Sequence, residues 1–246
     1  MEYYCTIKNR TDGFGAQLQT ILYTLFYCEK ENKIFLYNPI KSMEHNYDND
    51  INFINKVNHY INLSQNFEEY NILNTKNIKL FSFEDIIPII ESNIDNYINK
   101  KTTKKYKEIF WQNKKKFNNN KFNISIHIRR PNQHDNRIEG ARTPFEYYIN
   151  IINIIRKQYN NKDLLFHIYS QGNIDDFKCF LNNDVIFHIN EDQFETFTGL
   201  VGADILVTSA SSFSYTAGLI TDGIVYYLPF WHKPLKDWII CDKTLI

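Results

Sequence analysis

Several residue types that usually shape a protein chain are scarce in this sequence. Its 246 residues include only 8 glycines, 5 alanines and 6 arginines, whereas isoleucine, asparagine and lysine number 35, 31 and 22. This bias is typical of a genome that favours A/T-rich codons. Glycine, alanine and arginine should therefore persist mainly where structure or function requires them, so their positions are informative.

Long apolar runs, clustered cysteines and an excess of charge are also absent. No run of about 18 apolar residues suits a transmembrane helix, and the segment from Met1 to Cys5 lacks the features of a secretory signal. The four cysteines fit neither a zinc site nor a disulfide scaffold. Lys+Arg and Asp+Glu balance at 28 each, which gives no global charge that would favour nucleic acid. These absences predict a globular cytoplasmic protein with free thiols.

The scarce residues gather in two regions. Gly13, Gly15 and Ala16 lie near the start, and the other ten glycines and alanines fall between Gly140 and Gly223. Four of the six arginines are Arg129, Arg130, Arg137 and Arg142. The two regions that resist the bias are the N-terminal glycine turn and the second half of the chain.

The first half opens with a β-α-β pattern. It predicts a strand over Tyr3–Lys8, a turn at Gly13–Gly15, a helix over Ala16–Glu29 and a strand over Lys33–Tyr37. Further helices are predicted over Phe83–Ile98 and Thr103–Phe117. The stretch Lys100–Lys121 holds nine lysines against Glu108 alone, which favours a solvated helix face or a weak contact with an anionic surface.

The second half alternates short apolar strands with helices. Strands are predicted over Phe122–Ile128, Leu164–Tyr169, Val185–His188, Asp204–Thr208 and Ile224–Tyr227; helices are predicted over Pro144–Tyr159, Asn173–Phe180, Phe194–Gly202 and Phe213–Thr221. This alternation predicts an α/β protein whose parallel sheet is covered on both faces. We expect two Rossmann-like domains, residues 1–121 and 122–246.

Polar side chains follow three of these predicted strands. His127, Arg129 and Arg130 come at the end of the first, Ser170 and Gln171 follow the second, and Ser209–Ser212 precede a helix that starts at Phe213. Ligands of such sheets bind at the carboxyl ends of the strands. Arginine matches phosphate oxygens with a fixed fork of donors, and a helix N-terminus presents backbone N–H groups. Each feature alone is as consistent with a surface arginine pair and an ordinary N-cap; together they predict a diphosphate ligand.

Other phosphate-binding motifs are missing or incomplete. The sequence has no G-x-x-x-x-G-K-[ST] loop, and the turn Asp12–Gly15 lacks the third glycine of the dinucleotide fingerprint. That turn either lets the backbone approach a ligand closely or simply needs a positive φ.

Three stretches, in this order, resemble the fucosyltransferase group of GT-B glycosyltransferases, which includes α1,2-, α1,6- and protein O-fucosyltransferases. Gly13-Phe-Gly-Ala-Gln-Leu is similar to the G-x-G-N-Q-[LM] loop, and His127-Ile-Arg-Arg to the H-x-R-R motif. The segment from Ala203 to Ser214 resembles the stretch near the nucleotide. Arg130-Pro-Asn-Gln-His-Asp and Tyr169-Ser-Gln-Gly also resemble a branch found in large DNA viruses and microbes. If the gene is viral, we expect the protein in the host cytoplasm.

The resemblance implies a GT-B-like fold with two Rossmann-like domains whose parallel sheets face each other across a cleft, an acceptor-side domain followed by a donor-binding domain. It implies inverting transfer of a sugar, most often L-fucose from GDP-fucose, to a hydroxyl of a glycan acceptor, with no cofactor and no bound metal. Arg129 would stabilise the departing diphosphate and Arg130 would support the loop or the phosphate. Further residues implied or considered for substrate contacts are Gly13, Phe14, Gly15, Gln17, His127, Arg142, Ser170, Gln171, Asp204, Ser211, Ser212 and Phe213.

The sequence departs from the family pattern at two points. Ala16 replaces the amide of the G-N-Q loop, and Pro131-Asn132 replaces the usual G-D pair, which moves the nearest carboxylate to Asp135. An acceptor hydroxyl loses a proton as it attacks, and a carboxylate commonly takes that proton. We rank Asp135 first as this base, with Glu139 and Asp12 as alternatives.

Two other functional classes deserve comparison. A serine hydrolase would use Ser212 on its strand-to-helix turn with His232, but the G-x-S-x-G glycines are missing. A non-catalytic module that binds a nucleotide or glycan would keep the fold without the reaction. The aromatic segment Phe230–Leu235 either covers a base or sugar or packs on the core as a closing plug.

Overall fold

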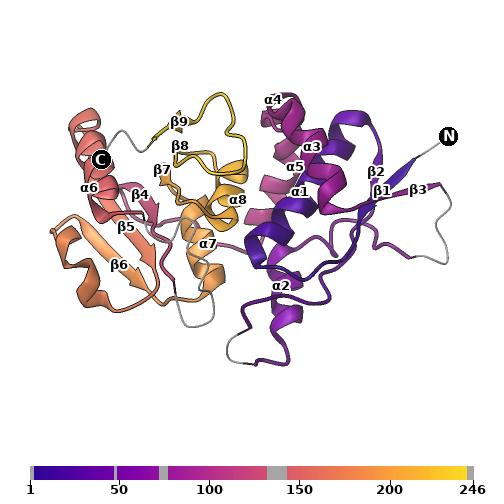
Figure 1. The fold of residues 1–246 in the computed structure, drawn as a ribbon, viewed down its shortest axis with the longest axis horizontal. Helices are drawn as coiled ribbons and strands as arrows, with labels where there is room; N and C mark the ends of the chain where they lie inside the picture. The colour runs from indigo at the N-terminus through magenta and orange to yellow at the C-terminus, as the bar shows by residue number, and fades with distance from the viewer. Residues whose placement is uncertain (1–2, 47–48, 72–76, 132–142, 243–246) are drawn as a thin grey trace. The chain divides into compact units, whose positions relative to one another are not determined.

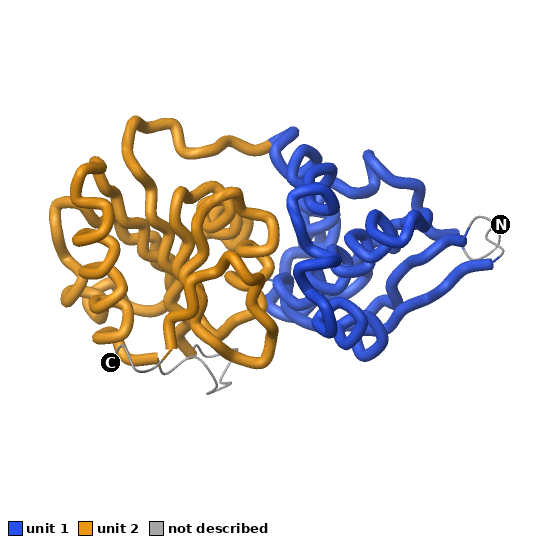
Figure 2. Tube along the Cα trace, turned by 90° about the horizontal axis from the view of Figure 1, so that it is seen from above, with its two compact units in different colours: residues 1–113 blue, residues 114–246 orange. Residues whose placement is uncertain are grey.

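The structure is a computed structural model that describes residues 3–46, 49–71, 77–131 and 143–242 (Figure 1). The chain forms two compact units, residues 1–113 and 114–246 (Figure 2). The domain boundary predicted from the sequence lies after Lys121.

Unit 1 contains a parallel sheet of three strands in the order β2-β1-β3. Its strands are β1 (Tyr4–Ile7), β2 (Ile34–Phe35) and β3 (Ile78–Phe81). Tyr4 of β1 is in register with Ile34 on one side and Ile78 on the other. The long helix α1 (Phe14–Glu31) connects β1 to β2 and buries most of its length, including Leu18, Leu22 and Phe26. The predicted β-α-β opening is confirmed, and β3 is a strand that the sequence analysis misses.

The remaining helices of unit 1 are α2 (Phe53–Ile61), α3 (Phe83–Ser92), α4 (Ile94–Tyr97) and α5 (Lys100–Trp111). The single helix predicted over Phe83–Ile98 is wrong, because Asn93 has a φ of −149° and divides α3 from α4. The prediction over Thr103–Phe117 is also too long at its end. Asn99 caps α5 by accepting from the backbone N–H groups of Lys101 and Thr102, and the helix ends at Trp111.

The lysine-rich stretch is therefore not one helix face. On α5, Lys104 pairs with Glu108 and Lys105 pairs with Glu29. Lys114 lies beyond the helix, where burial lowers its pKa to about 8, and Lys121 forms an ion pair with Asp163. Contact with an anionic surface stays a prediction.

Unit 2 contains a parallel sheet of six strands in the order β6-β5-β4-β7-β8-β9. The strands are β4 (Phe122–His127), β5 (Leu164–Ser170), β6 (Val185–Ile189), β7 (Ile205–Val207), β8 (Ile224–Tyr227) and β9 (Ile239–Ile240). Five of them confirm the predicted strands, and β9 is an addition at the edge. Ile124 of β4 is in register with Phe166 of β5 and with Ile205 of β7, so β4 lies at the centre.

Helices α6 (Phe145–Gln158), α7 (Gln193–Val201) and α8 (Ser212–Ile220), with the 3-10 helix η1 (Ile174–Phe180), connect these strands. Helix α6 buries Tyr148, Ile151, Ile152 and Ile155, which recur at the spacing of one helical face. These side chains share one core with strand residues such as Ile126, Ile168 and Val207. On the other face, the Ser125 hydroxyl donates to the Gly199 carbonyl of α7. The sheet is thus covered on both faces, as predicted.

Asparagine occupies several backbone positions that have a positive φ, a conformation that glycine adopts most easily. The C-caps of α1 and α2 are Asn32 (φ 50°) and Asn62 (φ 61°), both left-handed. Asn49, Asn77 and Asn190 also have positive φ, and His45 is the remaining non-glycine example in the described part of the chain. A short polar side chain tolerates this conformation better than most others do. None of the described helices is both long and apolar enough to cross a bilayer.

Candidate functional site

The strand order of unit 2 creates a topological switch point. After β4 the chain moves by way of α6 to β5 and then β6 on one side, and it returns by way of α7 to β7 on the other side of β4. This is the doubly wound order in which the loops after the first and fourth strands diverge and leave a crevice at the carboxyl edge. The residues that follow β4 and β7 are therefore the first candidates for a ligand site.

A hydrogen bond joins the ends of these two strands. His127 is the last residue of β4, and its Nδ1 lies 2.8 Å from the hydroxyl of Ser209, which follows β7. The His127 ring centroid is 5.5 Å from that of Phe213 in the first turn of α8. Ser209 also receives support, because its backbone N–H donates to the Ser214 hydroxyl at 3.1 Å. The imidazole is thus fixed in place at the switch point.

The environment keeps this imidazole neutral. Burial, and then the positive charge of Arg129, lower the pKa of His127 to about 3. The residue retains some accessible area, yet protein atoms surround the ring closely enough to disfavour a charge. At neutral pH one ring nitrogen is a donor and the other an acceptor.

Arg129 lies against the loop that leads into α8. Its Nη1 donates to the Ala210 carbonyl at 3.3 Å. Ser211 caps α8 by accepting from the Phe213 N–H, and Ser211, Ser212 and Phe213 all remain partly exposed. One guanidinium and one helix N-terminus therefore meet at the carboxyl edge, and both suit an anion.

Arg130 turns to a different neighbour. Its guanidinium carbon lies 4.0 Å from the ring centroid of Phe145 at the start of α6, and its Nη1 donates to the Thr143 carbonyl at 3.0 Å. Burial lowers the pKa of Arg130. Arg129 thus contacts the loop before α8, whereas Arg130 contacts the start of α6. The sequence could not indicate the contact of Arg130 with Phe145, since it depends on the packing of α6.

Other predicted residues occupy distinct places. The Ser170 hydroxyl, at the end of β5, donates to the Ile128 carbonyl at 2.6 Å and so joins neighbouring strand ends. Gln171 is exposed next to it. Asp204 lies at the opposite, amino edge of the sheet, where its carboxylate accepts from the Asn123 N–H at 2.7 Å. Arg142, Asp135 and Glu139 lie outside the described residues.

The glycine turn of unit 1 is built mainly from internal contacts. Gly13 has a φ of −68°, so the explanation that the turn needs a positive φ is wrong. A Cβ atom there would lie 3.1 Å from the His45 ring, which gives a steric reason for glycine. Gly15 is already inside α1, and Phe14 packs in the core at 2 % exposure, 5.8 Å from the Tyr60 ring.

Gln17 holds the same turn closed. Its Nε2 donates to the carbonyls of Asp12 and Ser42 at 2.9 and 3.0 Å, and the residue is buried. The Asp12 carboxylate accepts from the Gly13 N–H and pairs with Arg10. A small recess lies next to this turn, at the carboxyl ends of β1 and β2, and Arg10 and Gln17 belong to its lining.

The substrate contacts expected after β7, Ser211, Ser212 and Phe213, do not include Ser209 and Ser214. Both are fully buried, and their hydroxyls orient His127 and the loop before α8. The signal that could have identified them is the presence of four serines between Ser209 and Ser214, directly after a buried strand.

The aromatic segment after β8 divides into two parts. His232 is buried and its ring stacks on Tyr215 with centroids 4.9 Å apart, whereas Trp231 is 63 % exposed. The imidazole that a serine hydrolase would require is thus packed on α8. Within the described residues, no three acidic, cysteine or histidine side chains are grouped to hold a metal ion.

No family model matches the chain, and no curated protein matches it in sequence. Solved structures do resemble it. The heptosyltransferase WaaC of E. coli, solved with ADP, is 9 % identical, with a TM-score of 0.51 over 98 % of this chain and 93 % of that one. This chain has a GT-B glycosyltransferase fold.

Fucosyltransferases are among the other structures that resemble this GT-B chain. The Bradyrhizobium enzyme NodZ is 10 % identical, with a TM-score of 0.43 over 90 % of this chain and 94 % of that one. An α1,6-fucosyltransferase NodZ structure co-crystallised with GDP is also 10 % identical, with a TM-score of 0.43 over 92 % of this chain and 96 % of that one.

Proposed function

We propose that this protein is an inverting, metal-independent glycosyltransferase that moves a sugar, L-fucose from GDP-fucose, onto a hydroxyl of a glycan acceptor. One observation carries the proposal. Arg129 and the N-terminus of α8 meet at the switch point of a glycosyltransferase-type sheet, and Arg129 donates to the carbonyl next to the helix cap. The choice of fucose rests on the resemblance of the H-x-R-R stretch.

In this proposal the second unit binds the donor diphosphate. Cleavage of a glycosyl–phosphate bond builds negative charge on the leaving group, and fixed donors stabilise that charge without reorganising. Arg129 supplies charged N–H donors, and Ser211, Ser212 and Phe213 supply hydroxyl and backbone N–H donors at the start of α8. A guanidinium and a helix end together provide the positive potential that a metal ion provides in other transferases.

His127 is proposed to contact the donor through its second ring nitrogen. Its Nδ1 faces Ser209, so Nε2 is the atom left for a hydroxyl or phosphate oxygen. Because burial keeps the ring neutral, the contact is a neutral hydrogen bond and not an ion pair. Ser209 thereby sets the orientation of a residue that would touch the ligand.

The remaining predicted residues receive supporting roles. Arg130 and Ser170 hold the loops on the β5 side, and Gln171 is exposed at the same edge for a contact with the nucleoside. Arg142 remains proposed as a donor contact or a loop brace. Asp204 braces β4 and β7 at the far edge of the sheet, which leaves it outside the proposed ligand contacts.

The first unit is proposed to serve the acceptor. Gly13 and Gly15 shape the turn, while Phe14 and Gln17 stabilise it from inside, so backbone atoms would provide its ligand contacts. The proposed bases are Asp135 first, then Glu139 and Asp12. The Asp12 carboxylate forms an ion pair with Arg10.

Calorimetric titration of the full chain with GDP, GDP-fucose and ADP tests the donor assignment. We expect GDP and GDP-fucose to bind with a 1:1 stoichiometry and more tightly than ADP. Binding of none of the three would refute the proposal. Binding of GDP-fucose without any release or transfer of fucose, across a panel of glycans, would instead identify a non-catalytic nucleotide-binding module.

The three candidate bases are separated by Asp135→Asn, Glu139→Gln and Asp12→Asn. The true base should lose transfer by about 100-fold or more, with its affinity for GDP unchanged. Equal and small effects of all three variants would show that none of these carboxylates takes the proton.

A further inference from the structure

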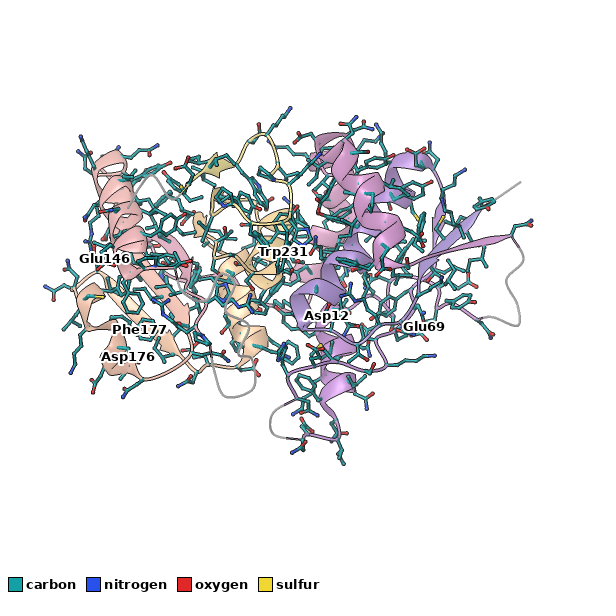
Figure 3. The ribbon with its side chains drawn as sticks, in the orientation of Figure 1. Asp12, Glu69, Glu146, Asp176, Phe177 and Trp231 are labelled. Atoms are coloured by element: carbon teal, nitrogen blue, oxygen red, sulfur yellow. The ribbon has the colours of Figure 1, made fainter. Side chains whose placement is uncertain are left out.

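An exposed indole projects from the loop that follows β8. Trp231, labelled in Figure 3, is 63 % exposed, although its neighbour His232 is only 6 % exposed. Isolated exposed apolar side chains are common and require no explanation by themselves.

The backbone on both sides of Trp231 is fixed by buried tyrosines. The Tyr227 hydroxyl donates to the His232 carbonyl at 2.5 Å and accepts from the Phe230 N–H at 3.4 Å. The Tyr215 hydroxyl donates to the Lys233 carbonyl at 2.7 Å. The indole is thus presented to solvent from a fixed backbone, which lowers the entropic cost of using it to bind a ligand.

This loop lies at the same sheet edge as the candidate site. Strand β8 is parallel to β7, and the Leu228 N–H that follows β8 donates to the Thr208 hydroxyl that follows β7. Tyr215, which holds Lys233, belongs to the first turns of α8. Trp231 therefore lies on a loop that is anchored to the first turn of the helix that is proposed to hold the diphosphate.

The topology indicates which part of a ligand would reach this loop. In doubly wound sheets, the strand next to the first one contributes side chains to the nucleoside ribose, and here that strand is β5, on the far side of β4 from β8. The β8 side is then left for the group attached to the other end of the diphosphate. An indole has an apolar face for the C–H groups of a sugar ring and one N–H donor for a hydroxyl.

We infer that Trp231 is a binding platform for a pyranose ring at this edge. Two sugars share the required chemistry: the one attached to the donor diphosphate and the one that accepts transfer. The location beside the proposed diphosphate site rests on the proposed function, whereas recognition of a sugar ring by Trp231 can be measured without it.

The test uses Trp231→Ala and Trp231→Phe in the full chain, with Trp111→Phe in unit 1 as the matched tryptophan control. Near-ultraviolet circular dichroism and thermal unfolding establish that each variant folds. Calorimetry with GDP and GDP-fucose measures the donor arm. Saturation-transfer NMR with L-fucose and N-acetyllactosamine measures the free-sugar arm.

If the donor sugar is the occupant, Trp231→Ala lowers the affinity for GDP-fucose by roughly 3- to 10-fold and leaves the affinity for GDP unchanged. If the acceptor sugar is the occupant, both nucleotides bind as before and saturation transfer to the free sugars falls by a similar factor. Trp231→Phe keeps most of either interaction because it keeps an aromatic face, and Trp111→Phe changes neither.

Equal weakening of GDP and GDP-fucose would place the nucleobase on the indole and overturn the inference. Unchanged binding in both arms would overturn it as well. If the wild-type chain binds no nucleotide but its saturation transfer to free sugars depends on Trp231, the proposed function fails while the sugar platform stands.

Discussion

The two units start a helix at the carboxyl edge of a parallel sheet in different ways. In unit 1, α1 begins at Phe14, which is buried, and Gln17 uses its amide to bind the carbonyls of its own turn. In unit 2, α8 begins with residues that stay partly exposed, and Arg129 donates to the carbonyl before its cap. The same strand-turn-helix pattern thus gives a closed structural turn in one unit and a polar edge in the other.

The difference shows what decides whether a motif residue is available to a ligand. A polar side chain near a helix start is unavailable to a ligand when a neighbouring loop packs over it and accepts its hydrogen bond, as the loop through Ser42 after β2 does for Gln17. It stays at the surface when the preceding loop is short and buried, as Thr208 and Ser209 are before α8. Motif identity alone does not distinguish the two cases.

Among the tests of this comparison, the largest effect on activity is expected at Arg129. Arg129→Lys replaces a planar fork with a point charge, and transfer of the sugar should fall by about 100-fold or more. Arg130→Lys is the matched control, because this residue stacks on Phe145 and binds the Thr143 carbonyl. Steady-state kinetics with GDP-fucose, beside calorimetry with GDP, measures both; a larger loss in Arg130→Lys would reverse the assignment.

A second test compares one glycine from each unit. A Cβ at Gly223 would clash with the backbone carbonyl oxygens of Ala203 and Asp204, so Gly223→Ala should cost about 3 kcal/mol of unfolding free energy. Gly13→Ala would meet only the ring of His45, a side chain that can move, and should cost less than about 1 kcal/mol. Urea unfolding followed by circular dichroism gives both values. A larger loss of stability for Gly13→Ala than for Gly223→Ala would show that the glycine turn is more tightly packed than the surroundings of Gly223.

Gln17→Ala sharpens the role of the turn in unit 1. The variant removes two hydrogen bonds from a buried residue to the Asp12 and Ser42 carbonyls, and we expect a loss of about 1–3 kcal/mol in stability. GDP affinity should not change. The exposed Gln171 provides the control, since its replacement by alanine should leave stability within about 0.5 kcal/mol. A fall in GDP affinity with full stability would instead assign the Gln17 amide to the ligand.

Acidification is expected to lower the stability of unit 2 by less than the Gly223→Ala substitution does. Burial, with a neighbouring positive group, lowers the pKa values of His127 and His167 to about 3 and about 4. The unfolded chain therefore binds more protons than the folded one between about pH 6.5 and pH 4, so stability falls as pH decreases through this window. From pH 6.5 to 5.5 we expect each of the two rings to contribute a loss of about 1 kcal/mol, about 2 kcal/mol together.

Thermal unfolding across that pH range, for the wild type and for His167→Gln, checks this expectation. The variant should lose part of the pH dependence while the trend from His127 remains. A wild-type midpoint that does not change between pH 6.5 and 4 would contradict the neutral state of both rings.

Sequence patterns predicted the second unit better than the first for a physical reason. Its strands read as short apolar runs, and the central ones, β4, β5 and β7, are largely buried on both faces, so five of the six described strands were located. Strand β3 of unit 1 has only four residues, Ile78–Phe81, of which only Phe81 is buried, and it lies in an asparagine-rich region. The missed helix α2 has only nine residues and buries only Val57 and Ile61.

The sequence predicted the position of the candidate site, because the parallel direction of the strands determines it, but not the contacts of its side chains. All strands of a parallel sheet end at one edge, which brings His127, Arg129 and the start of α8 together whatever the side chains do. Side-chain partners come from elements that are distant in sequence. The stacking of Arg130 on Phe145 and the contact of His127 with Ser209 therefore required the structure.

The asparagines in left-handed conformation also affect the unfolded chain. Glycine at Asn32, Asn62 or Asn190 would adopt the same φ, but it would have more backbone conformations to lose on folding. Asparagine reaches this conformation while its Cβ restricts the denatured ensemble. A composition that is poor in glycine therefore need not weaken these helix and strand ends, and here it reduces the entropy that folding must overcome.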